Sequence, residues 1–323
     1  MRKFLNISII LLAVLTSCKN SEWDFPDYKI QSVYFAYQTP IRTITLGEDI
    51  FDTTLDNQFR CQIMATTGGV YDNENDINIG ITVDNTLIQG RSFAAPIGGL
   101  IRAMPSNYYS LSANNIVIPK GNLIGGVTVQ LTDAYFADPL SVRTTYVIPV
   151  KMTNVQKADS ILSSKNYTLY AIKYINPWTG VYLRRGKDVM VGKNGNTALT
   201  QTITRRQQFV ERDQINSIHT RGLKQAEFPV TYRGVGGVNV TLNLLLTFDD
   251  SGNFTVSPGA TGFTATGSGK FVKRGEKKSW GDKDRDALYL NYNIDATDFS
   301  VSTTDTLVLR DRGVAFQTFT PVN

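Results

Sequence analysis

Short β-rich runs separated by turn residues fill this sequence, and they constrain its fold more than any other feature. Val, Ile, Thr, Tyr and Phe recur in runs of alternating polarity, whereas no window of about 11 residues or more keeps a helical period. In the run 59–65, Cys61 takes the position of a small core residue. We therefore expect an all-β protein with little helix.

The first half of the chain predicts an immunoglobulin-like β-sandwich over residues 29–175. Seven or eight short strands within about 150 residues are typical of that architecture. The sequence predicts strands near 30–38, 41–46, 58–66, 77–84, 115–118, 125–131, 143–152 and 167–175.

The second half, residues 176–323, predicts a lipocalin-like antiparallel β-barrel. The boundary falls at Asn176-Pro177-Trp178, where a proline follows a long strand and a new β-rich series begins. About ten meandering strands with little helix are typical of an up-and-down barrel, which closes its own edges. We expect these strands near 179–184, 188–192, 197–205, 226–232, 238–248, 253–257, 263–273, 286–295, 305–310 and 314–319.

The N-terminus has the pattern of an exported bacterial lipoprotein. Arg2 and Lys3 precede an apolar run that ends at Leu15, and this run is too short to span a membrane, which needs roughly 20 residues. Leu15-Thr16-Ser17-Cys18 then matches a lipobox, so we expect a signal peptide over 1–17 and lipid attachment at Cys18. Residues 18–28 would form the anchor and tether. The mildly acidic residues that follow favour an outer-membrane protein that faces the cell exterior and contacts the membrane through its lipid alone.

Composition argues against several classes of function. When Arg2 and Lys3 are taken from the 33 basic residues, 31 remain against 28 acidic residues, so nucleic-acid binding is not expected. His219 is the single histidine, which disfavours a catalytic triad or a zinc site. The alternate acids of 282–286 have the spacing of a calcium loop, but its glycine and terminal glutamate positions hold Ala287 and Asn293. We expect no enzyme activity, no cofactor and no bound metal.

Aromatic side chains are the candidate ligand contacts, because flat aromatic faces pack on the apolar side of sugar rings. Trp280 is the strongest candidate, since it lies at the tip of a charged hairpin and not in an apolar run. Tyr289 alternates with Leu288 in the following strand. The remaining candidates are Trp178, Tyr108 and Tyr109.

Several stretches resemble a Bacteroidetes-type surface lipoprotein family of unknown function. They are 23–28, 33–38, 41–47, 105–111 and 146–154, together with Pro177-Trp178-Thr179-Gly180-Val181-Tyr182-Leu183. The resemblance implies an N-terminal immunoglobulin-like domain, also found at the head of some endoglycosidase-like glycoside hydrolases, followed by a lipocalin-like domain. It brings no catalytic motif, and its members are associated with glycan uptake.

These features favour a non-catalytic, surface-anchored glycan-binding accessory lipoprotein of a polysaccharide-uptake system. Its partners would be a glycan or polysaccharide and a TonB-dependent transporter complex. The alternatives are a lipocalin-like carrier of a small apolar ligand and a structural partner subunit of the uptake complex. The barrel interior separates the first two: an open aliphatic cavity would favour the carrier, and a packed interior with exposed aromatics elsewhere would favour the glycan.

Overall fold

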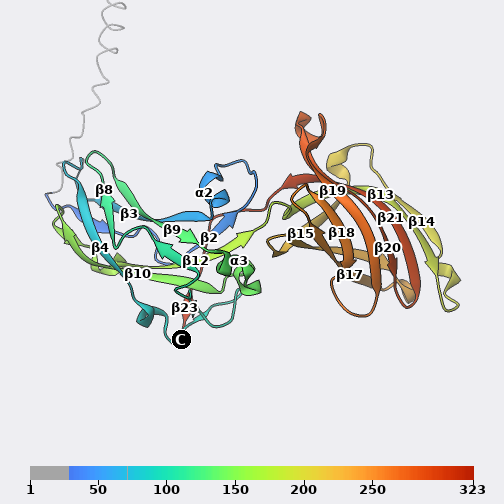
Figure 1. The fold of residues 1–323 in the computed structure, drawn as a ribbon, viewed down its shortest axis with the longest axis horizontal. Helices are drawn as coiled ribbons and strands as arrows, with labels where there is room; N and C mark the ends of the chain where they lie inside the picture. The colour runs from blue at the N-terminus through green and yellow to red at the C-terminus, as the bar shows by residue number, and fades with distance from the viewer. Residues whose placement is uncertain (1–28, 71) are drawn as a thin grey trace, which may run out of the picture.

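The protein consists of two β domains that lie end to end (Figure 1). The computed structural model describes residues 29–70 and 72–323, so Cys18 and the predicted signal peptide lie outside the described residues. Within that range, no helix is long and apolar enough to cross a membrane. The helices are short turns: α2 (Thr54–Asn57), α3 (Asp133–Ala137), and the 3₁₀ turns η1 (Asn85–Ile88), η2 (Pro139–Val142), η3 (Ser163–Lys165), η4 (Thr197–Leu199), η5 (Val210–Arg212), η6 (Val235–Gly237) and η7 (Trp280–Asp282).

The N-terminal domain is a sandwich of two sheets. The first sheet has the order β11 (Ser160–Ile161), β1 (Ser32–Tyr34), β3 (Arg60–Gly68), β9 (Ile124–Leu131) and β7 (Tyr109–Leu111). The second has the order β22 (Gln317–Thr318), β2 (Pro40–Thr45), β12 (Tyr167–Ile175), β10 (Tyr146–Gln156), β4 (Ile77–Val83) and β8 (Asn115–Ile118), with β6 (Arg102–Ala103) beside β10. A separate pair joins β5 (Ser92–Phe93) to β23 (Pro321–Val322).

The sandwich core forms between the inward faces of the two sheets. Along β3, Cys61, Ile63 and Ala65 are buried while the residues between them face outward, because side chains alternate along a strand. These side chains pack with residues of the opposite sheet such as Ile79 and Ile172. Cys61 is therefore a core residue, as its alternating context predicts.

The C-terminal domain is a closed antiparallel barrel of eight strands. They follow one another in sequence: β13 (Gly180–Gly192), β15 (Gln214–Gly222), β16 (Gln225–Arg233), β17 (Asn239–Phe248), β18 (Asn253–Pro258), β19 (Thr264–Glu276), β20 (Arg285–Asp295) and β21 (Phe299–Asp311). Pairing of β13 with β21 closes the ring, and β14 (Gln201–Arg205) lies beside β13 as an additional strand. The predicted order of a sandwich followed by an antiparallel barrel is confirmed.

Several strand predictions for residues 176–323 differ from the structure, including 314–319, of which only β22 (Gln317–Thr318) forms a strand and pairs with the sandwich. The predicted strands 179–184 and 188–192 form the single strand β13, and the predicted strand 197–205 begins with the turn η4. Strand β15 was not predicted, because its sequence is polar and its apolar residues do not share a face: Ile218 is buried, whereas Ile215 is 56% exposed. The backbone pairing of β15 with β13 and β16 outweighs this weak pattern.

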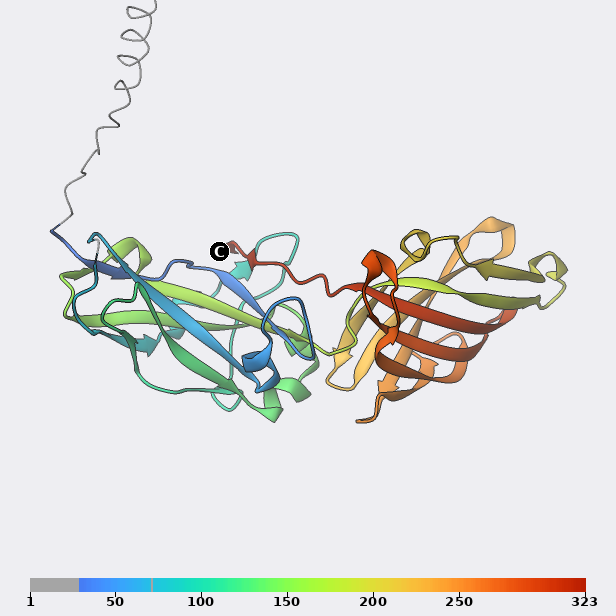
Figure 2. The same cartoon turned by 90° about the horizontal axis from the view of Figure 1, so that it is seen from above.

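The last residues of the chain leave the barrel and return to the sandwich (Figure 2). Gln317 of β22 pairs with Ile41, and Pro321 of β23 pairs with Phe93. Phe319 is 6% exposed and packs with Ile41 and Phe93 in a small core beneath the outer face of the second sheet. The domain prediction that placed residues 176–323 in the barrel therefore differs from the structure, whose barrel strands end at Asp311.

Arg312 fastens the two domains where the tail leaves the barrel. Its side chain is buried and donates hydrogen bonds to four backbone carbonyls: Thr179 at 2.6 Å, Glu48 at 3.0 Å, Leu46 at 3.1 Å and Asn176 at 2.7 Å. Burial lowers the pKa of this guanidinium. Bonds from a charged donor to buried carbonyls are among the stronger hydrogen bonds in proteins, so Arg312 fixes the domain junction.

Candidate functional site

Trp178 lies inside one end of the barrel. It is 8% exposed, and its ring stacks on Phe248 with a centroid distance of 3.7 Å and an interplanar angle of 5°. Its carbonyl accepts a hydrogen bond from the Tyr182 hydroxyl at 2.8 Å. One face of the ring is therefore covered by Phe248 and the residue is almost fully buried, so Trp178 contributes packing at the start of the barrel.

Tyr108 and Tyr109 are half-buried at the edge of the sandwich and pack against its core. The Tyr108 ring makes edge contacts with Tyr135 and Tyr146, and its hydroxyl donates to Asp138 at 3.1 Å. Burial and then the neighbouring carboxylate raise the pKa of Tyr108. These contacts engage the ring and hydroxyl of Tyr108 with the protein itself.

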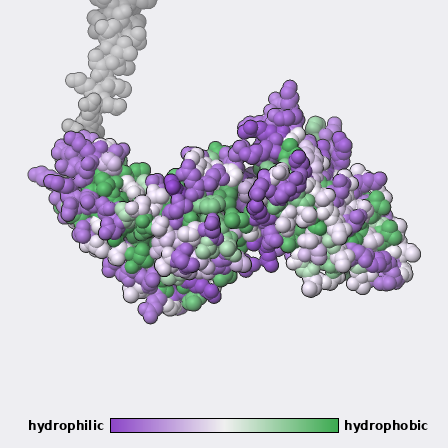
Figure 3. All heavy atoms as spheres, viewed as in Figure 1, coloured by the Kyte–Doolittle hydropathy of each residue, from purple (hydrophilic) through white to green (hydrophobic). Residues whose placement is uncertain are grey.

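Trp280 and Tyr289 belong to the hairpin formed by β19 and β20, whose tip projects from the barrel and is hydrophilic (Figure 3). The Trp280 indole N–H donates to the Leu309 carbonyl at 3.2 Å, and the Arg285 guanidinium covers the ring at 3.8 Å from its centroid. The Tyr289 hydroxyl donates to Glu276 at 2.7 Å. The structure therefore does not bring the five predicted aromatics into one site.

The acidic side chains of the hairpin are bonded to neighbouring groups. Asp284 accepts from the Lys277 ammonium at 2.9 Å, and Asp286 accepts from the Arg274 backbone N–H at 2.8 Å. Across residues 29–70 and 72–323, no group of three or more His, Cys, Asp or Glu side chains has an arrangement that could hold a metal ion.

An exposed aromatic pair lies elsewhere, on the sandwich. Tyr37 is 56% exposed and Phe316 is 65% exposed, with their ring centroids 4.7 Å apart and an interplanar angle of 50°. Beneath them is a groove of about 260 Å³. Its lining comprises Ala36, Tyr37, Pro40, Ile41, Arg42, Gln62, Ile63, Met64, Thr168, Tyr170 and Phe316. We refer to it as the aromatic groove.

Backbone pairing positions the two exposed rings. The Thr168 hydroxyl donates to the Tyr37 carbonyl at 2.9 Å, which fixes the loop between β1 and β2. Phe316 directly precedes β22, whose pairing with β2 holds the tail against the sandwich edge. The Lys173 ammonium also donates to Gln317 at 2.9 Å. The groove is thus built from segments at opposite ends of the described chain.

Polar groups border the apolar floor of the aromatic groove. The Arg42 guanidinium, 30% exposed, pairs with the buried carboxylate of Asp56, which also accepts from the Thr45 backbone N–H at 2.8 Å. Burial raises the pKa of Asp56 even though Arg42 acts in the opposite direction. The exposed Gln62 side chain adds an amide to the lining. The groove therefore combines aromatic faces with hydrogen-bonding groups.

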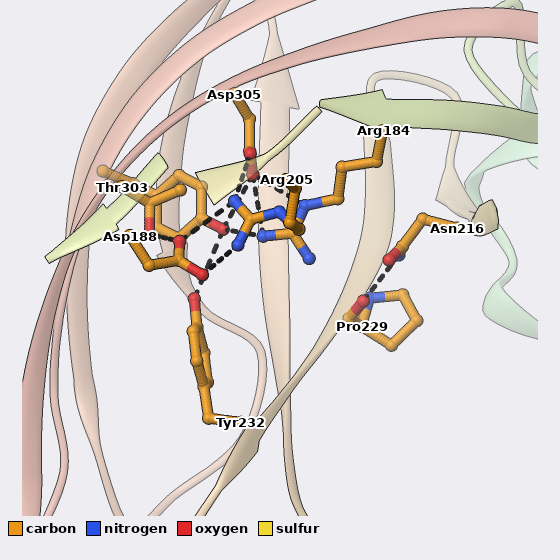
Figure 4. A network of polar contacts seen from close by, with 9 residues as sticks. Arg184, Asp188, Arg205, Asn216, Pro229, Tyr232, Thr303 and Asp305 are labelled. Atoms are coloured by element: carbon orange, nitrogen blue, oxygen red, sulfur yellow. Dashed lines mark hydrogen bonds and ion pairs between the residues drawn. The ribbon is translucent and has the colours of Figure 1, made fainter. Parts of the chain in front are cut away.

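The barrel interior contains a network of buried charges (Figure 4). Arg184 donates to Asp305 at 2.8 Å and to the Tyr292 hydroxyl at 2.8 Å. Arg205 reaches in from β14 and donates to Asp305 at 2.6 Å and to Asp188, with which it makes two contacts. Burial alone would lower the pKa of Arg184, but Tyr292 and Asp305 beside it raise that pKa overall. Two arginines thus balance two aspartates.

Gly186 makes room for this network. A Cβ atom at Gly186 would lie 2.3 Å from Asp305 Oδ1 and 2.2 Å from the Thr304 carbonyl oxygen, distances that real Cβ atoms do not reach. Phe228 lies against Arg184, whose guanidinium is 5.3 Å from the ring centroid. Together with the apolar residues around them, these groups fill the middle of the barrel with side chains.

Sequence reasoning missed Tyr37 and Phe316 as exposed aromatics. One signal was available for the tail: Phe316 and Phe319 are three residues apart, so in an extended segment they point to opposite faces. Phe319 is buried and Phe316 is exposed, as that spacing requires when one face is covered. For Tyr37 the local pattern was misleading: it falls in the predicted strand 30–38 in the phase of the buried Phe35, whereas β1 ends at Tyr34 and Tyr37 lies in the loop beyond it.

The fold and the groove define a two-domain protein in which a β-sandwich with a surface groove carries a closed β-barrel. One family model, a domain of unknown function called DUF5627, matches residues 177–313, and a second, described as an N-terminal domain, matches residues 27–159. A Bacteroides ovatus protein of unknown function, whose crystal structure is known, is 40% identical in sequence to this chain. The match covers 91% of this chain and 99% of that protein, and the two structures superpose with a TM-score of 0.85. The chain belongs to the same family as that Bacteroides ovatus protein.

Two further solved structures from Bacteroides ovatus are more distant. One, of unknown function, is 13% identical with a TM-score of 0.44 and covers 90% of this chain and 100% of its own. The other, described as a candidate carbohydrate-binding protein, is 10% identical with a TM-score of 0.28 and covers 90% of this chain and 99% of its own. Both TM-scores are below 0.5, so neither structure superposes on the whole of this chain as one fold. No curated protein matches the sequence.

Proposed function

We propose that this protein is a non-catalytic, surface-anchored glycan-binding accessory lipoprotein of a polysaccharide-uptake system, and that the aromatic groove binds the glycan. The observation that carries the proposal is the exposed Tyr37–Phe316 pair above a concave apolar floor. Contiguous exposed apolar surface such as this pair and the groove beneath it often marks a site that contacts a ligand or partner. Arg42 and Gln62 at the border supply the polar groups that a sugar requires.

The filled barrel interior supports this function over a carrier of a small apolar ligand. An eight-stranded barrel is only just wide enough to be filled by side chains or to hold one small ligand. Here Tyr182, Arg184, Phe228, Tyr292 and Phe299 are fully buried in the barrel. An apolar ligand in their place would have to displace paired charges, which is costly because each charge would lose its partner.

Anchoring through Cys18 completes the proposal. A lipid at that position would hold the protein at the outer membrane, where a TonB-dependent transporter complex is the expected partner for uptake of the bound glycan. Replacing Cys18 by Ala is expected to abolish membrane retention without changing the fold or glycan affinity. Cell fractionation and titration of the purified protein test the two parts, and continued retention of the Cys18→Ala protein in the membrane fraction would contradict the anchor.

Titration calorimetry against a panel of neutral polysaccharides and host-type glycans tests the groove, with the lipid-free mature chain (residues 18–323, Cys18→Ala). Tyr37→Ala and Phe316→Ala should each weaken binding by about tenfold, which corresponds to roughly 1.4 kcal/mol. Phe209→Ala is the matched control, because Phe209 is 46% exposed but lies on the barrel. Absence of binding to every glycan, or unchanged affinity in both groove variants, would refute the proposal.

A further inference from the structure

A crevice runs between the two domains on the side of the chain junction. It consists of two adjoining hollows, of about 220 Å³ and about 620 Å³, that share Ile175, Thr179 and His219 in their linings. The sandwich contributes Arg143 and Lys173, and the barrel contributes residues of β15 and β16. We call it the junction crevice. It does not share a lining residue with the aromatic groove.

The charges that line the junction crevice are strongly unbalanced. Its cationic side chains are Arg143, Lys173, Arg221 and Arg312, and its single carboxylate is Glu227. Glu227 lies 3.9 Å from Arg221 and so compensates that charge only. Arg312 is already engaged with four backbone carbonyls at the junction. Two cations, Arg143 and Lys173, are left facing the crevice without a carboxylate.

Neither of these two cations forms an ion pair with a carboxylate, as a cation with a purely structural role would be expected to do. Among the described residues, the Arg143 guanidinium makes no hydrogen bond or ion pair with another group. The Lys173 ammonium donates only to the neutral amide of Gln317, and burial lowers the pKa of Lys173. Arg143 is exposed and Lys173 is half-buried, and cations without counter-charges attract an anion because the local field is not cancelled.

The remaining lining residues indicate what kind of anion fits. Thr179, Thr220, Ser217 and Gln225 supply hydroxyl and amide groups, and the exposed His219 side chain lies in both hollows. A combined volume of several hundred Å³ is typical of sites for small organic ligands and exceeds what a single phosphate or sulfate ion would need. A lining that combines cationic groups with uncharged polar groups matches an oligomer whose units carry both hydroxyl and acid groups.

We propose that the junction crevice binds an acidic carbohydrate chain, in which carboxylate or sulfate groups contact Arg143 and Lys173 and sugar hydroxyls contact the threonines and Gln225. The site is separate from the aromatic groove and stands whether or not that groove binds a neutral glycan. Its walls come from both domains, so the fixed junction at Arg312 sets the width of the crevice.

The test is calorimetric titration of the lipid-free mature chain (residues 18–323, Cys18→Ala) with hexagalacturonate and with the fully methyl-esterified form of the same oligosaccharide. A sulfated dextran is paired in the same way with unmodified dextran. The acidic member of at least one pair should bind about tenfold or more tightly than its neutral counterpart, and its affinity should fall as salt is added. Equal affinity within both pairs, or no binding of either acidic member, overturns the proposal.

Charge-neutral variants locate the site. Arg143→Gln and Lys173→Gln should each weaken binding of the acidic chain by about fivefold to tenfold, and the charge reversal Arg143→Glu should weaken it further. Arg206→Gln, which removes an exposed cation outside the crevice, should change affinity less than twofold, roughly the resolution of the method. Circular dichroism checks that each variant is folded. Affinities of the crevice variants that match the Arg206→Gln control would refute the assignment.

Two further titrations distinguish other sources of the same anionic chemistry. Inorganic phosphate and vesicles of phosphatidylglycerol should neither bind at the affinity of the oligosaccharide nor displace it. Binding of vesicles alone would overturn the proposal in favour of a membrane surface, and displacement by phosphate at equal concentration would overturn it in favour of a small anion. Tyr37→Ala should leave binding of the acidic chain intact, so failure of the aromatic groove and failure of the crevice are separable.

Discussion

The two domains fill their interiors with different chemistry. The sandwich core contains apolar side chains and tyrosines such as Tyr135 and Tyr174, and its buried ion pair of Arg42 with Asp56 lies beside the surface groove. The barrel interior instead contains two arginines and two aspartates that bond to one another. Both interiors are packed, but the matched charges lie at the margin of the sandwich and in the middle of the barrel.

This difference teaches why the candidate sites lie outside the barrel. A buried network of matched charges has few alternative arrangements, because any displaced member leaves an unpaired charge in a medium of low dielectric. The barrel therefore acts as a fixed body, and ligand-sized spaces occur where the sandwich surface and the domain junction are shaped by loops and the tail. Four changes test this contrast.

Replacing Arg184 by Met should have the largest effect. It leaves two buried aspartates with only Arg205 to balance them, and breaking a buried pair by removing one member costs about 3–5 kcal/mol. The double change Arg184→Met with Asp305→Leu should recover most of that loss, because neither charge then remains. Urea unfolding measures both free energies. A double variant no more stable than Arg184→Met would show that the network contributes more than charge matching.

Replacing Arg312 by Met should cost less, about 3 kcal/mol, since several hydrogen bonds from one charged donor are lost at once. The expected consequence is a looser junction with both domain cores intact. Limited proteolysis should cut near the junction sooner than in the unchanged protein, and small-angle scattering should report a larger radius of gyration. Unchanged scattering and proteolysis would mean that the tail strands alone hold the domains together.

Alkaline pH probes the tyrosine-rich sandwich core. Burial, and then the charge of Asp138, raises the pKa of Tyr174 to about 12 from an ordinary value of 10.0. Because the folded pKa lies above the unfolded value, this stability is fully present below pH 10 and is lost as pH rises from 10 to 12. At about 1.4 kcal/mol per pKa unit the loss is about 2–3 kcal/mol.

The variant Tyr174→Phe isolates that contribution. It should be less stable than the unchanged protein by about 1 kcal/mol below pH 10, because the hydrogen bond from Tyr174 to the Phe136 carbonyl is lost. The gap between the two proteins should shrink above pH 10 and reverse in sign before pH 12, because the unchanged protein loses about 2–3 kcal/mol that the variant does not. Urea unfolding at a series of pH values gives the comparison, and a gap that stays constant to pH 12 would disprove the pKa assignment.

The smallest effects are expected for two tyrosines on opposite faces of the same barrel strand. Tyr289→Phe removes a hydrogen bond to Glu276 on the outside of the barrel and should cost about 1 kcal/mol. Tyr292→Phe removes a hydroxyl bonded to both Arg184 and Asp305 inside it and should cost about 2 kcal/mol. Thermal unfolding of the two variants gives the ranking, and the reverse order would contradict the importance of the internal network.

Much of the fold could be predicted because alternation is a local property. The predicted strands 58–66 and 167–175 correspond closely to β3 and β12, and both alternate or run apolar with clear turn residues beside them. Strand β15 could not be predicted, since its backbone pairing and not its side chains places it in the barrel. The inward phase of Tyr292 and the outward phase of Tyr289 follow from their odd spacing.

The candidate sites could not be predicted from the sequence for a different reason. Tyr37 and Phe316 are separated by almost the whole described chain, and the contact between them depends on where the tail returns. Trp280 lay in a charged hairpin as expected, but nothing in its neighbourhood indicated that Arg285 would cover its ring. Local pattern gives secondary structure, whereas a surface site depends on long-range contacts that one sequence does not display.

The return of the tail has a consequence for how the protein is assembled. In topological terms the barrel is an insertion within the sandwich, since β22 and β23 complete the sandwich after the barrel has been made. A chain emerging N-terminus first would therefore complete its first domain last, with Ile41 and Phe93 uncovered until Phe319 arrives. A nascent chain that stopped after β21 would contain a complete barrel joined to a sandwich that lacks β22 and β23.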